Sequence, residues 1–344
     1  MKRVSASVVI PIYNGAKRIR RTLQSVIAQG DCVKEVICVD DASTDATADT
    51  VEVISQTMPK LRLLRMDKNV GPLAARLEGV KVATGDYIVF ADCGDRLLRD
   101  SLRGIIALAA ATESDITAGA SRLRVGPFTR LYHSPRSAMG EEYPASNASD
   151  VASVRNAYLA ILSGKLWTSM CAYVYNREFL LAELPKAISA RVGEDFYFNA
   201  SVFSRACSIQ LTDHQFYEWR YSGMGGKYYI DGYEGMLSAY GAIYDMLGDD
   251  VEAKRIFSQN LLDRLREAVT ERILRRHRKE DVIRFAAESL SQPLFRESLA
   301  DVVEYCGESK ECINGETMYR LAEMHLRRHK KFYIFTRIIS PFVK

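Results

Sequence analysis

The sequence predicts an α/β fold, a doubly wound and mostly parallel sheet followed by a C-terminal helical appendage. Three observations lead to this prediction. Short apolar runs alternate with amphipathic segments over the first hundred residues. Two of the runs are followed directly by clusters of aspartate. Beyond about residue 234 the pattern becomes helical and charged, with Leu261, Leu265 and Val269 at helical spacing.

The first segments alternate between the periods of a strand and of a helix. Buried parallel strands are predicted at residues 6–10, 35–39, 61–66 and 87–91, and helices at 16–29, 43–58 and 72–83. Pro11 is expected to end the first strand, and Ser43 is expected to cap the second helix. Strands joined by helices predict right-handed crossovers and a parallel sheet.

The middle of the chain is more mixed. Residues 116–125 and 128–133 alternate like antiparallel edge strands, residues 141–149 are polar and predict a loop, and a helix is expected over 150–162. A glycine-rich stretch, 223–226, marks the best boundary. We therefore expect two domains, residues 1–225 and 226–344.

Composition narrows the class of protein. The chain has 344 residues, 47% of them hydrophobic, so it can bury a sizeable core. Its net charge of +4 is too small to indicate nucleic acid as a partner. The seven cysteines are scattered without a C-x-x-C pair, which favours reduced thiols and a cytoplasmic protein. The N-terminus lacks a signal pattern, and no apolar run reaches about 18 residues.

The two acidic clusters predict a ligand site. The carboxyl ends of parallel strands meet at one edge of the sheet, where open α/β folds bind ligands. Asp41 is placed to accept an N–H group from a nucleotide base, while Asp92 and Asp95 offer hard oxygen ligands to Mg²⁺ or Mn²⁺ bridging two phosphates. The alternative for each cluster is an ordinary turn, with helix capping for residues 43–45.

Further polar residues extend the expected nucleotide site. Pro11, Tyr13 and Asn14 follow the first strand, where the tyrosine ring could stack on a base. Asn69 and Arg76 flank the start of a helix whose N-terminus could face phosphate. By itself, a stretch such as Pro11–Asn14 after a strand is more often an ordinary turn.

Taken together, the segments resemble the bacterial, inverting family 2 glycosyltransferases of GT-A fold, a Rossmann-like architecture, over roughly residues 5–225. The matching pieces stand in the family's order: Pro11–Asn14, Val39–Asp45, Asn69–Arg76, Gly85–Asp92 and Gly193–Asp195. One departure concerns the metal. Gly94 stands where the family's D-x-D motif has its second aspartate, which leaves Asp92 and Asp95 as the candidate ligands.

The resemblance also assigns chemical roles. It implies that Asp195, beside Glu194, is the general base, and that Arg220 holds the diphosphate of the donor. The alternative for the acidic pair is that it only complements a helix dipole. His214 is either a third metal ligand or a structural residue. The aromatic segment 166–180 is either core or a face that stacks on acceptor sugars.

The expected function is transfer of a hexosyl or N-acetylhexosaminyl group from a nucleotide-diphosphate sugar, by default a UDP-sugar, to a hydroxyl of a bacterial surface glycan or its lipid-linked precursor. Residues 325–344 mix basic and aromatic side chains and predict either contact with the inner face of the plasma membrane or a docked helix. The alternative function is a non-catalytic nucleotide- or glycan-binding scaffold at the membrane, which Gly94 favours. A nucleotidyltransferase would need a glycine-rich phosphate loop after the first strand, and residues 11–15 are not one.

Overall fold

The computed structural model describes residues 4–125, 128–139, 151–220, 233–302 and 304–328. The chain divides into two compact units, one formed by residues 1–161 and 165–220 and the other by residues 162–164 and 221–344. The glycine-rich boundary and the polar loop expected from the sequence lie outside the described residues.

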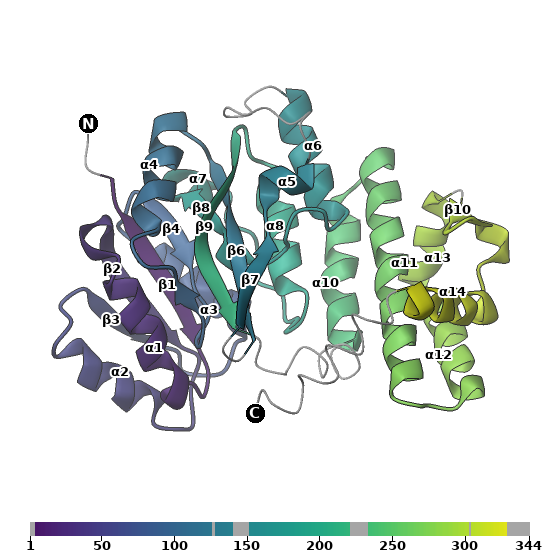
Figure 1. The fold of residues 1–344 in the computed structure, drawn as a ribbon, viewed down its shortest axis with the longest axis horizontal. Helices are drawn as coiled ribbons and strands as arrows, with labels where there is room; N and C mark the ends of the chain where they lie inside the picture. Colours follow the sequence, from purple (N-terminus) through teal and green to yellow (C-terminus); the bar gives the residue numbers. More distant parts are fainter. Residues whose placement is uncertain (1–3, 126–127, 140–150, 221–232, 303, 329–344) are drawn as a thin grey trace. The chain divides into compact units, whose positions relative to one another are not determined.

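The first unit is a mixed α/β layer structure around one sheet (Figure 1). Its parallel part has the order β3-β2-β1-β4, and the central strands are buried on both faces, as parallel sheets require. The strands are β1 Ala6–Ile12, β2 Val33–Asp40, β3 Leu61–Arg65 and β4 Tyr87–Phe90. The helices between them are α1 Ala16–Ile27, α2 Thr47–Ser55 and α3 Pro72–Lys81. The expected strand and helix alternation is therefore confirmed.

The second part of the sheet changes direction. After β4 the order continues β8-β6-β9-β5, with β8 antiparallel to both β4 and β6, and β9 parallel to β6. The strands are β5 Arg96–Leu97, β6 Ile116–Val125, β7 Phe128–His133, β8 Tyr173–Asn176 and β9 Ile209–Arg220. The helices are α4 Leu102–Thr112, α5 Pro135–Met139, α6 Val151–Leu162, α7 Arg177–Ala182 and α8 Glu194–Phe203.

One expectation about this region was wrong. β6 pairs antiparallel with β7 as predicted, but it is not an edge strand, because it also pairs with β8 and β9. Small side chains explain the position, since Ala118 and Ala120 are fully buried between neighbours. β8 is not predicted from the sequence, because its four residues are too few to show a period.

Two expected boundaries also differ. Pro11 lies within β1 and pairs with Val39 of β2. Its missing N–H costs nothing there, because β4 ends opposite Val9 and no strand continues on the other side. Ser43 does not cap α2, which begins at Thr47 with Ala46 at the N-cap position.

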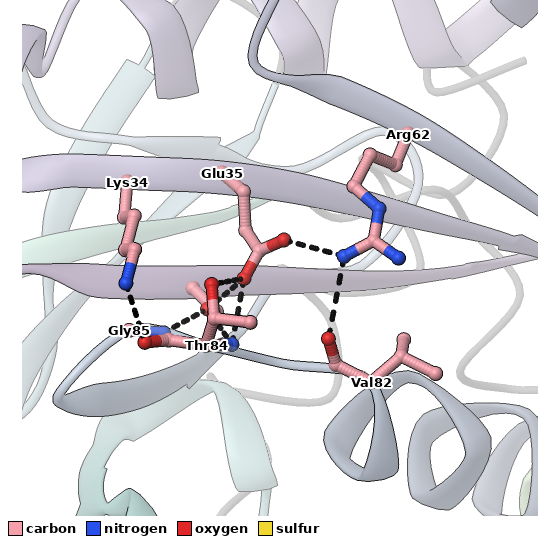
Figure 2. Close-up of polar contacts among 7 residues, drawn as sticks. Lys34, Glu35, Arg62, Val82, Thr84 and Gly85 are labelled. Atoms are coloured by element: carbon pink, nitrogen blue, oxygen red, sulfur yellow. Dashed lines mark hydrogen bonds and ion pairs between the residues drawn. The ribbon is translucent and has the colours of Figure 1, made fainter.

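A buried carboxylate ties the strands together at the amino-terminal edge of the sheet. Glu35 of β2 accepts hydrogen bonds from Ser7 Oγ at 2.8 Å and from the amide and hydroxyl of Thr84, each at 2.7 Å, and pairs with Arg62 at 2.7 Å. Figure 2 shows Glu35 between Arg62 and the turn at Thr84 and Gly85. Gly85 must lack a side chain, because a Cβ would lie 2.5 Å from the Ser7 nitrogen. This network fixes how α3 leads into β4.

The second unit is helical, with one short hairpin. Its elements are α10 Tyr233–Met246, α11 Val251–Leu274, α12 Lys279–Ser291, α13 Pro293–Asp301, β10 Glu304–Tyr305, β11 Glu308–Ser309 and α14 Gly315–Arg328. Figure 1 colours these elements from green to yellow. Leu162–Gly164 belong to this unit, and Asn260 of α11 donates a hydrogen bond to the Leu162 carbonyl at 2.7 Å. In the described part of the chain, each helix is too short or too polar to cross a bilayer.

The proposed membrane segment can be placed only in part. Residues 325–328 form the last turn of α14, and residues 329–344 lie outside the described residues. Contact with a membrane surface therefore stays a prediction.

We predict that Glu35→Ala lowers the free energy of unfolding by about 2–4 kcal/mol, because it removes a buried acceptor shared by three segments. Urea unfolding followed by tryptophan fluorescence measures this, since Trp167 and Trp219 both lie in the first unit. Glu52→Ala is the control. Glu52 forms an exposed ion pair with Arg65 at 2.9 Å, so the control should change stability by less than about 0.5 kcal/mol. Equal effects of the two substitutions would contradict the structural role of Glu35.

The same carboxylate gives a pH dependence. Burial raises the pKa of Glu35, but hydrogen bonds from Thr84, Arg62 and Ser7 outweigh it and leave the pKa below its usual value. Its stabilising contribution is thus complete above the ordinary pKa of glutamate and is lost as the pH falls through the lower pKa of the folded state. The difference in free energy of unfolding between wild type and Glu35→Ala should therefore become smaller as the pH falls through this lower pKa.

Candidate active site

One buried arginine organises the carboxyl edge of the sheet. Arg76 lies on α3 with only 4% of its side chain exposed. Its Nη2 pairs with Asp92 Oδ1 at 2.7 Å, and its Nη1 lies 3.1 Å from Asp195 Oδ1 and 3.7 Å from Glu194 Oε1. A planar guanidinium can hold several carboxylates in fixed directions. The arginine therefore brings together residues that lie more than 100 positions apart.

The start of α3 places Arg76. Both carboxylate oxygens of Asp41 accept backbone N–H groups, from Val70 at 2.7 Å and from Gly71 at 2.9 Å. Gly71 caps the helix with φ of 92°. These bonds fix the turn before α3 to the end of β2. Arg76, about one helical turn after the start of α3, is therefore held in place at the carboxyl edge of the sheet.

The loop after β4 presents Asp92. Its amide donates to the Tyr217 hydroxyl at 3.1 Å, and that hydroxyl donates to Asp95 Oδ2 at 2.7 Å. Gly94 bonds to the Thr22 hydroxyl at 2.9 Å and has φ of +117°, a conformation in which an aspartate would be strained. The backbone thus gives a physical reason for glycine where the family motif has its second carboxylate.

The acidic pair lies at the start of α8. Gly193, with φ of 82°, caps this helix, and Glu194 and Asp195 form its first turn. Burial and the neighbouring Asp195 raise the pKa of Glu194 to about 8, against the opposing charge of Arg76. Burial also raises the pKa of Asp195, with Arg76 opposing and Asp92 adding to the rise. The pair can therefore hold a proton near neutral pH.

Two of the expected ligand residues are engaged within the protein. Asp41 is 3% exposed, and its carboxylate is used by the turn before α3. Asp95 is 6% exposed and accepts from Tyr217 and from the Arg220 amide at 2.9 Å. Burial, and then the charge of Asp92, raise the pKa of Asp95 to about 8. In this structure both carboxylates bind backbone amides and so hold the neighbouring turns in place. That Asp41 binds a nucleotide base and that Asp95 binds a metal ion stay predictions.

The remaining predicted nucleotide residues line the same edge. Tyr13 is 46% exposed beyond β1, while Pro11 is buried within the strand. The Asn14 side-chain oxygen accepts from the Thr44 amide at 2.9 Å and so joins the loops after β1 and β2. Asn69 accepts from Arg191 at 2.6 Å. Tyr13 is thus the member of this group with the most ring surface open to a ligand.

Arg220 and His214 both lie on β9 but differ in place. Arg220 is exposed at the carboxyl end of the strand, which parallels β6 and so ends at the same edge as β1, β2 and β4. The His214 ring contacts the Ser101 carbonyl at 2.7 Å, beside α4. This contact supports the structural alternative for His214.

The charge of the site is unbalanced. Three carboxylates, those of Asp92, Glu194 and Asp195, surround the single Arg76 guanidinium, and Asp195 Oδ1 is buried without a hydrogen bond. Among the described residues, no group of three histidine, cysteine, aspartate or glutamate side chains is arranged to hold a metal ion by itself. A cation carried with a diphosphate still fits, because Mg²⁺ needs only one or two carboxylates beside phosphate oxygens. Asp92, whose side chain is 41% exposed, is the residue placed to supply one.

Sequence reasoning missed three residues that hold the site. Tyr217 joins β9 to the Asp92 loop. Ser169 and the Met170 amide hydrogen-bond the Asp195 carboxylate. The aromatic strand around Tyr217 was visible as a segment, but only the three-dimensional pairing shows which ring reaches the loop.

The sheet order, the buried arginine and the acidic residues at the carboxyl edge define an α/β domain of the GT-A class. The profile of the family described as Glycosyl transferase family 2 matches residues 7–167. Over residues 7–167 the chain is therefore similar to this glycosyltransferase family.

Several curated proteins resemble this region. A succinoglycan biosynthesis protein, ExoO, of Rhizobium meliloti is 39% identical over 108 residues, which are 31% of this chain and 30% of that protein. A poly(ribitol-phosphate) beta-glucosyltransferase of Bacillus spizizenii is 34% identical over 33% of this chain and 18% of its own length. The chain thus spans less than a third of the length of these two relatives.

Solved structures share the whole fold. A crystal structure of S. aureus TarS residues 1–349 in complex with UDP has a TM-score of 0.58 at 20% identity, covering 94% of this chain and 91% of that one. The complex of the same protein with UDP-GlcNAc has a TM-score of 0.57, again at 20% identity, over 94% of this chain and 92% of that one. At this identity the likeness establishes the fold.

We predict that Arg76→Met lowers the free energy of unfolding by about 3 kcal/mol or more at neutral pH, because it leaves buried carboxylates without their cation. The loss should be largest above about pH 8, where the acidic pair is ionised, and should shrink as the pH falls and the pair takes up protons in place of the lost charge. Urea unfolding at several pH values measures both effects. Arg65→Ala, which breaks an exposed pair, is the control and should show neither. A pH-independent loss would contradict the electrostatic role of Arg76.

Proposed function

We propose that the chain transfers a sugar from a nucleotide-diphosphate donor, a UDP-sugar, to a hydroxyl group of a bacterial surface glycan or its precursor, with inversion at the anomeric carbon. The observation that carries the proposal is the pairing of Arg76 with two carboxylates. Its guanidinium holds both Asp92 and Asp195 at the carboxyl edge of the sheet. Relatives named for succinoglycan and poly(ribitol-phosphate) chemistry, and the neighbour solved with UDP and UDP-GlcNAc, support the substrate classes.

Asp195 is the proposed general base. Its side chain is 23% exposed at a helix N-terminus, and Oδ1 is buried, so an acceptor hydroxyl would approach the other carboxylate oxygen. In the step, Asp195 takes the proton of the acceptor hydroxyl while that oxygen bonds to the anomeric carbon. The bond from this carbon to the diphosphate oxygen breaks, and the nucleoside diphosphate leaves with the electron pair. Glu194 shares the proton of the pair before the donor binds.

Donor contacts follow from the same edge. Tyr13 would stack on the base, and Arg220 would approach the diphosphate. A divalent cation bound through Asp92 would offset the charge of the leaving diphosphate. Arg76 pairs with all three carboxylates, so in this proposal it positions Asp92 and Asp195 and does not contact the donor.

The first test is Asp195→Asn. Transfer should fall at least about 1,000-fold, because the base is lost, while UDP binding stays within about threefold. Product formation from UDP-GlcNAc and UDP-glucose measures transfer, and the thermal shift by UDP with and without Mn²⁺ measures binding. The control is Glu178→Gln, at an exposed carboxylate in the first turn of α7.

Each outcome separates the alternatives. A fully active Asp195→Asn protein would remove Asp195 from the mechanism. UDP binding with no transfer in the wild type to any glycan acceptor would favour the non-catalytic scaffold instead.

The second test is the pH dependence of kcat/KM for the donor, which reports the free enzyme. Because burial raises the pKa of Glu194 to about 8 and also raises that of Asp195, the pair keeps a proton below this range. We expect kcat/KM to rise with pH and level off once the pair is ionised. Glu194→Gln removes one of two coupled charges, so the rise should move to lower pH. A flat profile from about pH 6 to about pH 9 would contradict the assignment.

A further inference from the structure

Three large aromatic rings from separate segments meet in the first unit. Tyr132 of β7 lies 5.5 Å from Trp167 and 5.3 Å from Trp219 of β9, measured between ring centroids, and the two tryptophans lie 6.4 Å apart. The ring planes are tilted by 50° to 72°, so no pair is stacked face to face. These three residues are called the aromatic cluster below.

The aromatic cluster is not part of the core. Tyr132 is 43% exposed, and Trp167 and Trp219 are partly exposed. A few residues further along the chain, Tyr173 and Tyr175 are at most 1% exposed and pack inside the sheet. The structure thus divides the aromatic segment, giving its later part to the core and leaving Trp167 at the surface. Partly exposed aromatic rings gathered in one place are typical of a binding surface.

The chemistry of the aromatic cluster is neutral. The nearest titratable ring, His133, has its centroid 6.3 Å from that of Trp167, and its Nε2 accepts the Trp167 amide at 3.3 Å. Burial lowers the pKa of His133 to about 4 against the charge of Asp213, so this ring is uncharged at neutral pH. Aromatic faces are electron-rich and attract polarised C–H groups. The C–H face of a pyranose ring is a neutral ligand of that kind.

Two links connect the aromatic cluster to the proposed catalytic residues. Tyr217 and Trp219 are two residues apart on β9, so their side chains point to the same face, and the Tyr217 hydroxyl accepts from the Asp92 amide. Trp167 is three residues before Met170, whose amide donates a hydrogen bond to the Asp195 carboxylate. Three residues span at most about 10 Å, a distance that an oligosaccharide can bridge.

We propose that Tyr132, Trp167 and Trp219 form an acceptor subsite that binds a pyranose ring next to the sugar whose hydroxyl is attacked. The inference rests on the proposed function and deepens it, because it makes the acceptor a saccharide and not a simple polyol. Tyr132, on the edge strand β7, supplies the most exposed ring and therefore most of the contact.

Binding can be measured without turnover. The chain has only two tryptophans, and both belong to the aromatic cluster, so tryptophan fluorescence reports this surface alone. The probes are methyl β-glycosides of glucose, galactose and N-acetylglucosamine, the disaccharide cellobiose, and ribitol as a polyol without a ring. We expect a saturable fluorescence change with at least one glycoside at concentrations up to about 100 mM, and none with ribitol.

Variants locate the contact. Tyr132→Ala should weaken the glycoside response about tenfold, whereas Tyr132→Phe should keep it within about twofold, because the ring and not the hydroxyl makes the contact. Leu131→Ala is the matched control, since Leu131 is 53% exposed and directly precedes Tyr132 on the same strand. In transfer assays Tyr132→Ala should raise the KM of the acceptor and leave the KM of UDP-GlcNAc unchanged.

The outcomes distinguish this inference from the proposed function. No saturable response to any glycoside, or an equal response in Tyr132→Ala, would overturn the subsite even if transfer occurs. A response to anionic phospholipid vesicles alone would overturn it in favour of a membrane contact. Saturable glycoside binding that depends on Tyr132, found in a protein without transfer activity, would uphold the subsite and reject only the enzymatic proposal.

Discussion

The architecture of the carboxyl edge depends on one buried cation. Arg76 pairs with three carboxylates from two separate segments, because Asp92 follows β4 whereas Glu194 and Asp195 are neighbours in the first turn of α8. Without that charge, the loop after β4 and the first turn of α8 would repel each other in a poorly solvated space. The guanidinium therefore links the loop after β4 and the first turn of α8 to α3.

Acidic residues that look alike in the sequence have separate tasks in the fold. Asp41 and Asp95 are buried and bind backbone amides, so they shape the turns on which the site is built. Asp92 and Asp195 keep part of their surface toward solvent. The Asp41 carboxylate has both oxygens occupied by backbone N–H groups, whereas Asp92, held by Arg76, has oxygen surface left for another partner. The degree of burial, more than the sequence motif in which a residue stands, distinguishes the aspartates that shape turns from those left open to a ligand.

The sequence predicted most of the first unit because apolar runs and helical periods are local signals. It placed the strands from residue 6 to residue 91 within two residues at most ends, and it found the acidic pair at the start of α8. It could not give β8, the interior place of β6, or the continuation of β1 through Pro11, because these depend on which strands lie alongside. Tyr217 and Ser169 were missed for the same reason, since their value lies in contacts across the sheet.

The chain passes between its two compact units three times, because Leu162–Gly164 belong with the helical unit while the residues on both sides belong with the sheet. A unit formed by one continuous segment can be transferred to another protein by joining it at a single position. Here the helical unit includes a tripeptide inserted in the sequence of the first unit and held by Asn260. A recombination event at residue 220 would separate the tripeptide from its helices. Grafting the helices onto another domain would therefore require moving both pieces.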